Sequence, residues 1–260
     1  MLNKIDTFFF PPEKKIFLNH SWLISCQTLC LLRMAFFLYA LGIYSMSNII
    51  NATVYKELKF LTYWGEILTM TSFLFLTLDS INYIQNFKKK ATDLSLVSKI
   101  GYIIYELAFS YELTIVLLFW LVIHPENKTD KDGIYYLVNF HTHFGCLVLL
   151  WIEKIFNYIE FMKNHAYIIF FVGICYIITN IIATFAIQNA PVYSVLTWKN
   201  AMSYIYTVVC FFIFLFHFTF GIIIFRKFKK KRNVFFLEDE GGNLQKREIS
   251  DNLSNFNLAL

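Results

Sequence analysis

Long apolar runs are the feature of this sequence that most constrains its fold. Crossing the hydrocarbon core of a bilayer as a helix takes about 20 mostly apolar residues. Such runs lie near 22–45, 60–83, 100–123, 135–156, 166–187 and 203–225. None contains a proline, and none shows the strict alternation that is typical of membrane β-strands. The sequence therefore predicts an all-α integral membrane protein, a multi-pass bundle of about six transmembrane helices.

The composition excludes an ordinary soluble domain. Of the 260 residues, 57% are hydrophobic and only 16% are charged. The five cysteines lie inside apolar runs without CxxC spacing, so we predict neither a disulfide framework nor a zinc site. Membrane lipids are the expected surroundings, and we predict no metal, no other cofactor and no nucleic-acid partner.

The distribution of positive charge predicts how the chain is oriented. Most of the 23 Lys and Arg residues lie in the N-terminal polar segment 1–21, in the loops after the second and fourth runs, and in the tail 226–260. The other three loops hold few. By the positive-inside rule, both ends of the transmembrane domain 22–225 then face the cytosol or the matrix of an organelle.

The C-terminal tail begins within the basic run FRKFKKKR, residues 225–232. Such a run either fixes the orientation of the last helix or attracts anionic lipid head groups. The remainder of the tail is polar and mixed in charge, which is typical of segments that are disordered when alone. We therefore expect a protein partner wherever this tail is ordered.

Polar residues form one stripe on each of two predicted helices. Steps of three and four residues align Asn139, His143, Cys146, Leu150, Glu153 and Asn157 on one helix, and Thr62, Glu66, Thr69, Ser72 and Asp79 on another. Polar groups in hydrocarbon are costly unless they meet partners or line a cavity. We therefore expect the two stripes to face each other inside the bundle.

The plainest interpretation of these residues is structural. Intramembrane Thr and His side chains commonly form hydrogen bonds between helices. Arg33 is expected to form an ion pair with Asp79 or Glu153 that locks the bundle, and Glu106 and Glu112 are expected to join the same interior.

Two chemical interpretations also remain open. Intramembrane histidines can bind haem iron from facing helices, but His143 and His217 lie at different depths and do not pair. Nucleophilic catalysis needs a hydroxyl beside a base, and Thr62 and His143 both lie in the outer leaflet of the predicted bundle.

Several segments resemble blocks of the androgen-induced transmembrane protein family, whose members hydrolyse fatty acid esters of hydroxy fatty acids. Three of them are CLLRMAFFLYALGIYS, NFHTHFGCLVLLWIE and PVYSVLTWKNAMSYIYTVVCFF, and they occur in the family's order within residues 28–225. The resemblance implies that Thr62, in the motif FLTY, is the nucleophile. It also implies that His143, four residues after Asn139 and ten before Glu153, is the catalytic histidine.

The function that this resemblance implies is hydrolysis of a lipid ester by a threonine nucleophile inside the membrane. Asn139 or the backbone at the start of the second helix is expected to stabilise the oxyanion. Glu66 is expected either to orient the histidine or to pair with a neighbouring span. The alternative is a non-catalytic structural or accessory subunit of a large membrane complex, for example a mitochondrial inner-membrane respiratory assembly, that has reused this fold. The abundance of Phe and Tyr favours that alternative, because aromatic side chains suit permanent interfaces.

Two sequence triplets bear on location. Asn51-Ala-Thr and Asn127-Lys-Thr are glycosylation acceptors, and both fall in loops that we predict to face outward. They favour the endoplasmic reticulum or another endomembrane, with the mitochondrial inner membrane as the alternative.

Overall fold

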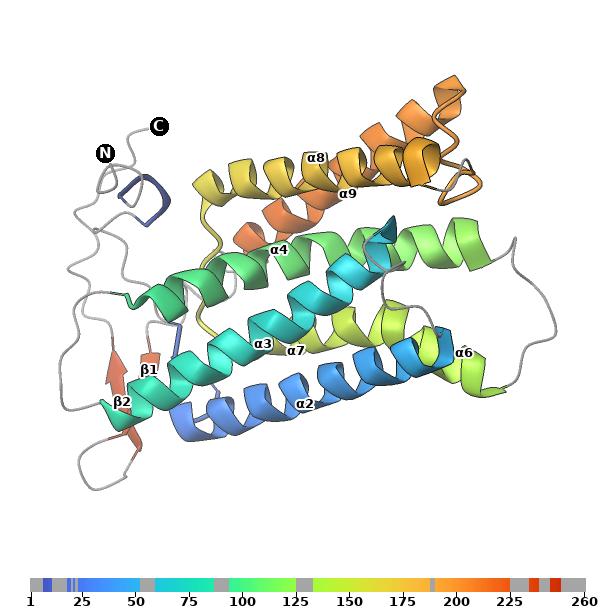
Figure 1. Cartoon of the computed structure of the whole chain (residues 1–260). Coiled ribbons are helices and arrows are strands. Elements are labelled where there is room, and N and C mark those ends of the chain that lie inside the picture. The colour runs from blue at the N-terminus through green and yellow to red at the C-terminus, as the bar shows by residue number, and fades with distance from the viewer. Residues whose placement is uncertain are drawn as a thin grey trace.

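Long helices that run in alternating directions make up most of the protein (Figure 1). The computed structural model describes residues 7–10, 18–19, 21, 23–51, 59–86, 94–124, 133–187, 190–224, 234–238 and 244–248. The α-helices of the bundle are α2 (Cys26–Asn51), α3 (Leu61–Gln85), α4 (Leu96–Leu118), α6 (Gly133–Phe140), α7 (Cys146–Phe156), α8 (Ala166–Ile182) and α9 (Ala201–Ile224).

Short turns of other helix types extend or join these elements. The π-helical turn η2 (Phe119–Ile123) continues α4, η3 (His141–Gly145) joins α6 to α7, and η5 (Ala183–Ile187) continues α8. A 3-10 turn, η4 (Lys163–His165), precedes α8. π-Helical turns are rare and occur mostly at functional sites, so η2 and η3 mark positions of interest.

Five helices among the described residues are long and apolar enough to cross a membrane. They are Cys26–Ile49, Leu61–Gln85, Leu96–Ile123, Lys163–Ile187 and Ala201–Ile224. The predicted all-α membrane bundle is therefore confirmed. The continuous helix Gly133–Phe156 covers the predicted run 135–156 but is not among the five. The number of six spans and the side of the termini stay predictions.

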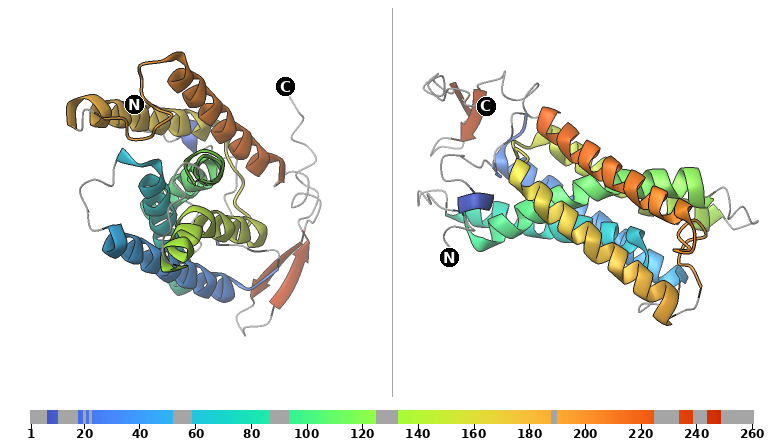
Figure 2. Two further views of the ribbon diagram at one scale, coloured as in Figure 1. Left: turned by 90° about the vertical axis from the view of Figure 1, so that its right-hand side faces the viewer. Right: turned by 90° about the horizontal axis from the view of Figure 1, so that it is seen from above.

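Helix α4 forms the centre of the bundle, with the other helices around it (Figure 2). It is the most buried of the five apolar spans, and its buried residues include polar ones such as Glu106 and Glu112. Its N-terminus is capped by Ser95, whose hydroxyl accepts a hydrogen bond from the Ser98 N–H at 3.0 Å. Its core residues pack against α3, with Tyr102, Tyr105, Phe109, Phe73 and Leu76 fully buried.

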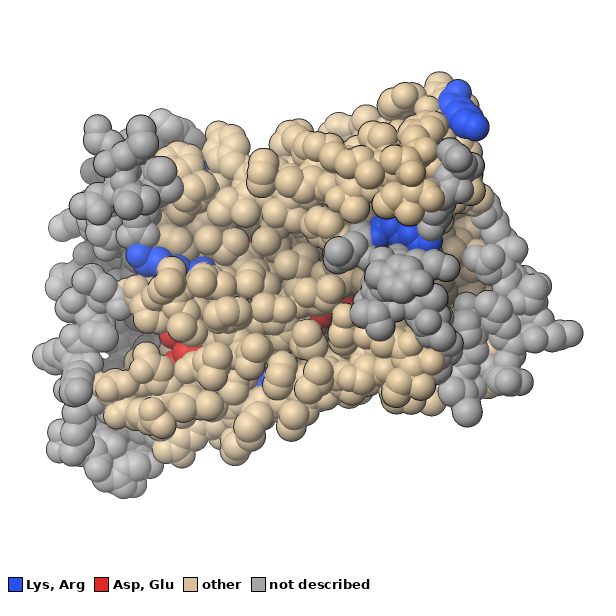
Figure 3. Space-filling view, viewed as in Figure 1, with Lys and Arg blue, Asp and Glu red and all other residues tan. Residues whose placement is uncertain are grey.

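The outer surface of the helices is apolar, as lipid contact requires. Large hydrophobic side chains stand exposed on α8 and α9, including Phe171, Ile178, Phe212 and Phe216. The space-filling view shows a face almost free of charge across the helices, with few Lys, Arg, Asp or Glu atoms visible (Figure 3). An exposed apolar surface of this extent marks a membrane protein.

Part of the C-terminal tail is ordered as a β-hairpin. Strands β1 (Val234–Glu238) and β2 (Leu244–Glu248) pair antiparallel, with Val234 opposite Glu248 and Glu238 opposite Leu244. The tail's overall polarity predicted disorder, but the run VFFLE is rich in residues that favour strands. The remainder of the tail lies outside the described residues.

Candidate functional site

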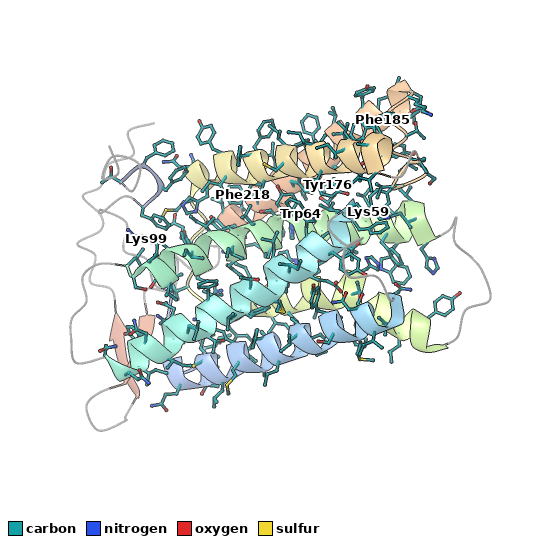
Figure 4. The ribbon with its side chains drawn as sticks, viewed as in Figure 1. Lys59, Trp64, Lys99, Tyr176, Phe185 and Phe218 are labelled. Carbon is teal, nitrogen blue, oxygen red and sulfur yellow. The ribbon has the colours of Figure 1, made fainter. Side chains whose placement is uncertain are left out.

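The start of α3 is held in place by hydrogen bonds from the α8–α9 side of the bundle. The N–H of Leu61 donates to the Tyr193 hydroxyl at 3.0 Å. The carbonyl of Lys59 accepts from the hydroxyl of Tyr176 at 3.2 Å and from the amide of Asn180 at 3.5 Å. We call these five residues the outer collar; Lys59 and Tyr176 are labelled in Figure 4.

The outer collar fixes the residue that follows it on α3, Thr62. Tyr193 lies in the loop before α9, outside the spans, and burial raises its pKa to about 12. Its phenol therefore stays neutral and remains an acceptor for the Leu61 N–H. A helix whose first turn is tied in this way holds its side chains in a fixed direction.

His143 lies on the π-helical turn η3, at the middle of the helix Gly133–Phe156. Its side chain is buried, with 6% exposed. The ring stacks on Phe119 of η2, with ring centroids 3.4 Å apart and planes within 11°. Both stacked rings thus come from π-helical turns, and the stacking holds the imidazole in one orientation.

The structure brings Thr62 and His143 together. The Thr62 Oγ1 lies 3.5 Å from His143 Nδ1, at the long limit for a hydrogen bond, and the Thr62 side chain is half-buried. For the hydroxyl to donate, Nδ1 must be the unprotonated nitrogen. The arrangement is that of a hydroxyl nucleophile beside a base.

The two residues start from different depths in their own helices. Thr62 is the second residue of α3, whereas His143 is the eleventh of the helix that begins at Gly133, about 15 Å along its axis. They meet because α6 and the end of α4 extend beyond the start of α3 (Figure 1).

The two supporting residues occupy different environments. Asn139 is half-buried on α6, one helical turn before His143. Glu66 is buried one turn after Thr62 on α3 and interacts electrostatically with Glu112 of α4. The structure thus places Glu66 beside another carboxyl group.

The Glu66–Glu112 pair lies beside Gly65, where side chains of α4 pack against the backbone of α3. A Cβ atom added to Gly65 would meet Ile115 Cδ1 and come within 2.6 Å of Glu112 Oε1. Thr69, one turn further along α3, donates its hydroxyl proton to Glu112 Oε1 at 3.1 Å. Part of the polar stripe of α3 therefore meets α4, and Glu66 and Thr69 of this stripe also interact with Cys146 of α7.

The predicted ion-pair residues separate into two neighbouring groups. Arg33 binds Glu153 Oε1 through both Nε at 2.9 Å and Nη2 at 2.7 Å, with both side chains fully buried. Asp79 instead accepts hydrogen bonds from Asn19 at 2.7 Å and from Ser98. Asn19 belongs to the N-terminal segment, and its side-chain oxygen accepts from Arg33 at 3.1 Å.

Arg33 also donates to the carbonyl of Leu18 at 2.7 Å, so this cluster ties the N-terminal segment to the bundle. Lys154, in the last turn of α7, is also fully buried. Its ammonium donates to the Ile159 carbonyl at 2.7 Å and lies 3.6 Å from the centre of the Phe161 ring. These contacts are structural and far along the bundle from Thr62.

Of the four remaining described histidines, His124 lies near Phe119, with ring centroids 5.9 Å apart, and the other three have separate surroundings. His165 bonds to Glu106, His141 bonds to Tyr39, and His217 stacks on Phe109 with ring centroids 4.2 Å apart. Within the described ranges, no three His, Cys, Asp or Glu side chains cluster as metal ligands would. His217 and His143 contact different partners, so these contacts offer haem no paired ligands.

Phe119, Tyr176 and Tyr193 are the site residues that sequence reasoning missed. Each is an aromatic residue in an apolar setting, where it cannot be told from one that faces lipid or the core. Only the hydroxyl groups of the two tyrosines could have identified them in the sequence, because a buried hydroxyl needs a hydrogen-bond partner.

No family model matches this chain, and no curated protein or solved structure matches it. The resemblance to the androgen-induced transmembrane protein family therefore enters the functional argument as an expectation.

Proposed function

We propose that this protein hydrolyses lipid esters within the membrane, with fatty acid esters of hydroxy fatty acids as the substrate class. Thr62 is the nucleophile and His143 the general base and acid. The observation that carries the proposal is the 3.5 Å separation of Thr62 Oγ1 from His143 Nδ1 in a bundle whose exterior faces lipid. The resemblance to the androgen-induced family supplies the substrate class.

The proposed reaction proceeds through an acyl-enzyme. His143 Nδ1 takes the proton of the Thr62 hydroxyl while Thr62 Oγ1 bonds to the ester carbonyl carbon. The resulting tetrahedral intermediate expels the hydroxy fatty acid, whose alkoxide takes the proton from His143. Water then attacks the acyl-threonine with His143 again as base, which releases the fatty acid and restores the Thr62 hydroxyl.

The developing negative charge on the carbonyl oxygen needs hydrogen-bond donors. The first turn of a helix has N–H groups without partners in that helix, and Thr62 lies in the first turn of α3. Asn139 is the side chain that we propose as a second donor. Its position one turn before His143 places it on the same helix as the base.

Two alanine variants test the proposal directly. Thr62→Ala and His143→Ala should each abolish hydrolysis of a fatty acid ester of a hydroxy fatty acid by the purified protein. Matched controls exist on the same elements. Thr77→Ala removes a hydroxyl of α3 that bonds its own Phe73 carbonyl at 2.7 Å, and His141→Ala removes the neighbouring imidazole of η3. Both controls should keep activity and a similar Tm.

Full hydrolysis by Thr62→Ala would refute the assignment of the nucleophile. Loss of activity in Thr77→Ala as strong as in Thr62→Ala would show that the assay reports folding rather than chemistry. A covalent acyl group on Thr62, seen by mass spectrometry after substrate is added, would support the acyl-enzyme independently.

The second candidate is a structural or accessory subunit of a membrane complex. It is favoured by the ordered hairpin of β1 and β2 in the tail, since such a hairpin offers strand edges to a partner. Recovery of the protein from native membranes as a monomer in mild detergent would argue against it. Co-migration with a large assembly, together with no ester hydrolysis, would favour it over the enzyme.

We propose the endoplasmic reticulum or another endomembrane as the location, with the mitochondrial inner membrane as the alternative. A mass shift that a glycosidase removes, and that is lost in Asn51→Gln or Asn127→Gln, would exclude the mitochondrial membrane.

A further inference from the structure

A pocket lies between α8, α9 and the loop that joins them, and the outer-collar residues Leu61, Tyr176 and Tyr193 form part of its lining. Its cavity volume is about 40 Å³, and the hollow measures about 440 Å³ when the open space around it is counted. Its walls come from Leu61 of α3, Leu118 of α4, Gly173 of α8, and Thr207, Cys210 and Phe214 of α9. Trp198 and Leu196 of the loop complete the lining, and no lining residue carries a charge.

The pocket ends one residue from each member of the Thr62–His143 pair. Leu61 lines the pocket and directly precedes Thr62 on α3. Leu118 lines it as well and directly precedes Phe119, whose ring stacks on His143. The pocket therefore adjoins the pair at the start of α3 and the end of α4.

The polar groups of the lining are already bonded to the protein. The Tyr176 hydroxyl donates to the Lys59 carbonyl at 3.2 Å, and the Thr207 hydroxyl donates to the Ser203 carbonyl of its own helix at 2.9 Å. The indole N–H of Trp198 donates to Asn180 at 2.9 Å. The pocket therefore presents mainly hydrocarbon and ring faces, which suit an apolar occupant.

Trp198 is held in the pocket wall at a conformational cost. Its φ of 59° lies in the left-handed region that bulky residues rarely adopt. Two hydrogen bonds hold it there, one from its own N–H to the Ser203 hydroxyl at 3.0 Å and one from its indole to Asn180. Strain of this kind persists where the surrounding structure over-determines a residue, and it clusters at ligand sites.

We propose that this pocket binds the fatty acyl chain of the ester substrate and thereby presents the ester carbonyl to Thr62. The inference rests on the proposed hydrolase function, which it deepens by naming the acyl subsite. An acyl chain fits the observations because it needs no hydrogen bonds and because the pocket reaches Leu61, the residue next to the nucleophile.

Photolabelling tests the subsite separately from the chemistry. The probe is a fatty acid ester of a hydroxy fatty acid with a diazirine in its acyl chain, applied to purified Thr62→Ala protein so that hydrolysis cannot consume it. Labelled residues are mapped by mass spectrometry, with and without an excess of the same ester lacking the diazirine. A parallel competition uses phosphatidylcholine.

Two tryptophan variants provide the matched comparison. Thr207→Trp fills the pocket from α9, whereas Val208→Trp places the same ring on the next residue, which is 53% exposed on the outside. We expect labels that the ester competes for on Leu196, Cys210 or Phe214, their loss in Thr207→Trp, and their retention in Val208→Trp.

The outcomes separate this inference from the proposed function. Labels confined to exposed residues of α8 and α9, or equal competition by phosphatidylcholine, would overturn the acyl subsite even if the wild type hydrolyses the ester. Pocket labelling that the ester competes for would support the subsite even if Thr62→Ala proved as active as the wild type. If Thr207→Trp fails to fold, the positions in the Thr62→Ala protein at which the ester competes with the label still decide whether the pocket binds the acyl chain.

Discussion

Thr62 and His143 lie 81 positions apart in the sequence, and their side-chain atoms approach to 3.5 Å. The sequence pointed to both residues through polarity and through a family resemblance, but their depths along the chain did not match. Phe119 was not predicted at all, because one phenylalanine among many in an apolar run carries no distinguishing signal. The chemistry of single residues identifies candidates for the site, but only the packing of the helices brings two of them into contact.

Phe119 should matter for hydrolysis although it touches no reacting atom in the proposed mechanism. Phe119→Ala removes the ring that stacks on His143 and frees the imidazole to rotate, so we expect kcat to fall by about a hundredfold with KM little changed. Steady-state kinetics with a lipid ester measure kcat and KM separately. Phe212→Ala, a truncation of an exposed ring on α9, is the control and should leave kcat unchanged. Equal kcat in the Phe119→Ala protein and the wild type would contradict the positioning role.

At the scale of elements, the packing of α3 on α4 depends on a glycine. Gly65 lets the two helices approach, and it lies between Thr62 and Glu66 on α3. Gly42 on α2 is exposed and has nothing within 4 Å of the position where a Cβ would stand. The two glycines look alike in the sequence, since each interrupts an apolar helical run.

Gly65→Ala and Gly42→Ala should therefore have opposite effects on stability. Alanine at position 42 gains helix propensity of about 1 kcal/mol and should leave Tm unchanged or raise it. Alanine at position 65 meets Ile115 and Glu112, so it should lower Tm and weaken hydrolysis by moving the start of α3. Thermal unfolding in detergent checks both variants. An unchanged Tm in the Gly65→Ala protein would mean that Ile115 and Glu112 of α4 move aside without loss of stability.

The buried ion pair between α2 and α7 gives a second prediction at this scale. Arg33→Met leaves Glu153 buried without its partner and should destabilise the bundle by about 3–5 kcal/mol. Arg33→Met combined with Glu153→Met removes both charges and should recover most of the loss in Tm. A double variant as unstable as the single one would indicate that Arg33 acts mainly through Leu18 and Asn19.

The whole molecule places its described polar clusters at two ends of an apolar body. Lys59, close to Thr62 at the start of α3, lies towards one end of the bundle, and Lys99 lies towards the other (Figure 4). Asp79 accepts a hydrogen bond from Ser98, the neighbour of Lys99. Between them, α4 carries the buried core. A lipid substrate would thus reach the pair from the leaflet opposite the basic tail.

Orientation in the membrane is testable at this scale. With six crossings, reporters fused to the two ends of the chain lie on the same side, and we expect both to be accessible from the cytosol or matrix. If helix Gly133–Phe156 does not cross, the five helices Cys26–Ile49 to Ala201–Ile224 place the reporters on opposite sides. Protease protection of the reporters in sealed membranes distinguishes the two arrangements.

The sequence by itself determined that the helices lie in a membrane, that the fold is helical and where most helices are. The reason is that a long apolar run in hydrocarbon is stable as a helix. Predicted helix limits agree with the structure to within a few residues for α3 and α9, since polar loops bound them. It also identified the residues that turn inward, because a charge such as Arg33 cannot face lipid at low cost.

Only the tertiary structure decided which of those residues meet. Asp79 turns to Asn19 and Ser98 rather than to Arg33, and Glu66 lies beside Glu112 of α4. The pairing depends on helix tilt, on the π-helical turns that carry Phe119 and His143, and on how far α6 extends beyond α3. These quantities follow from side-chain packing between distant segments, which a periodic pattern within one segment does not record.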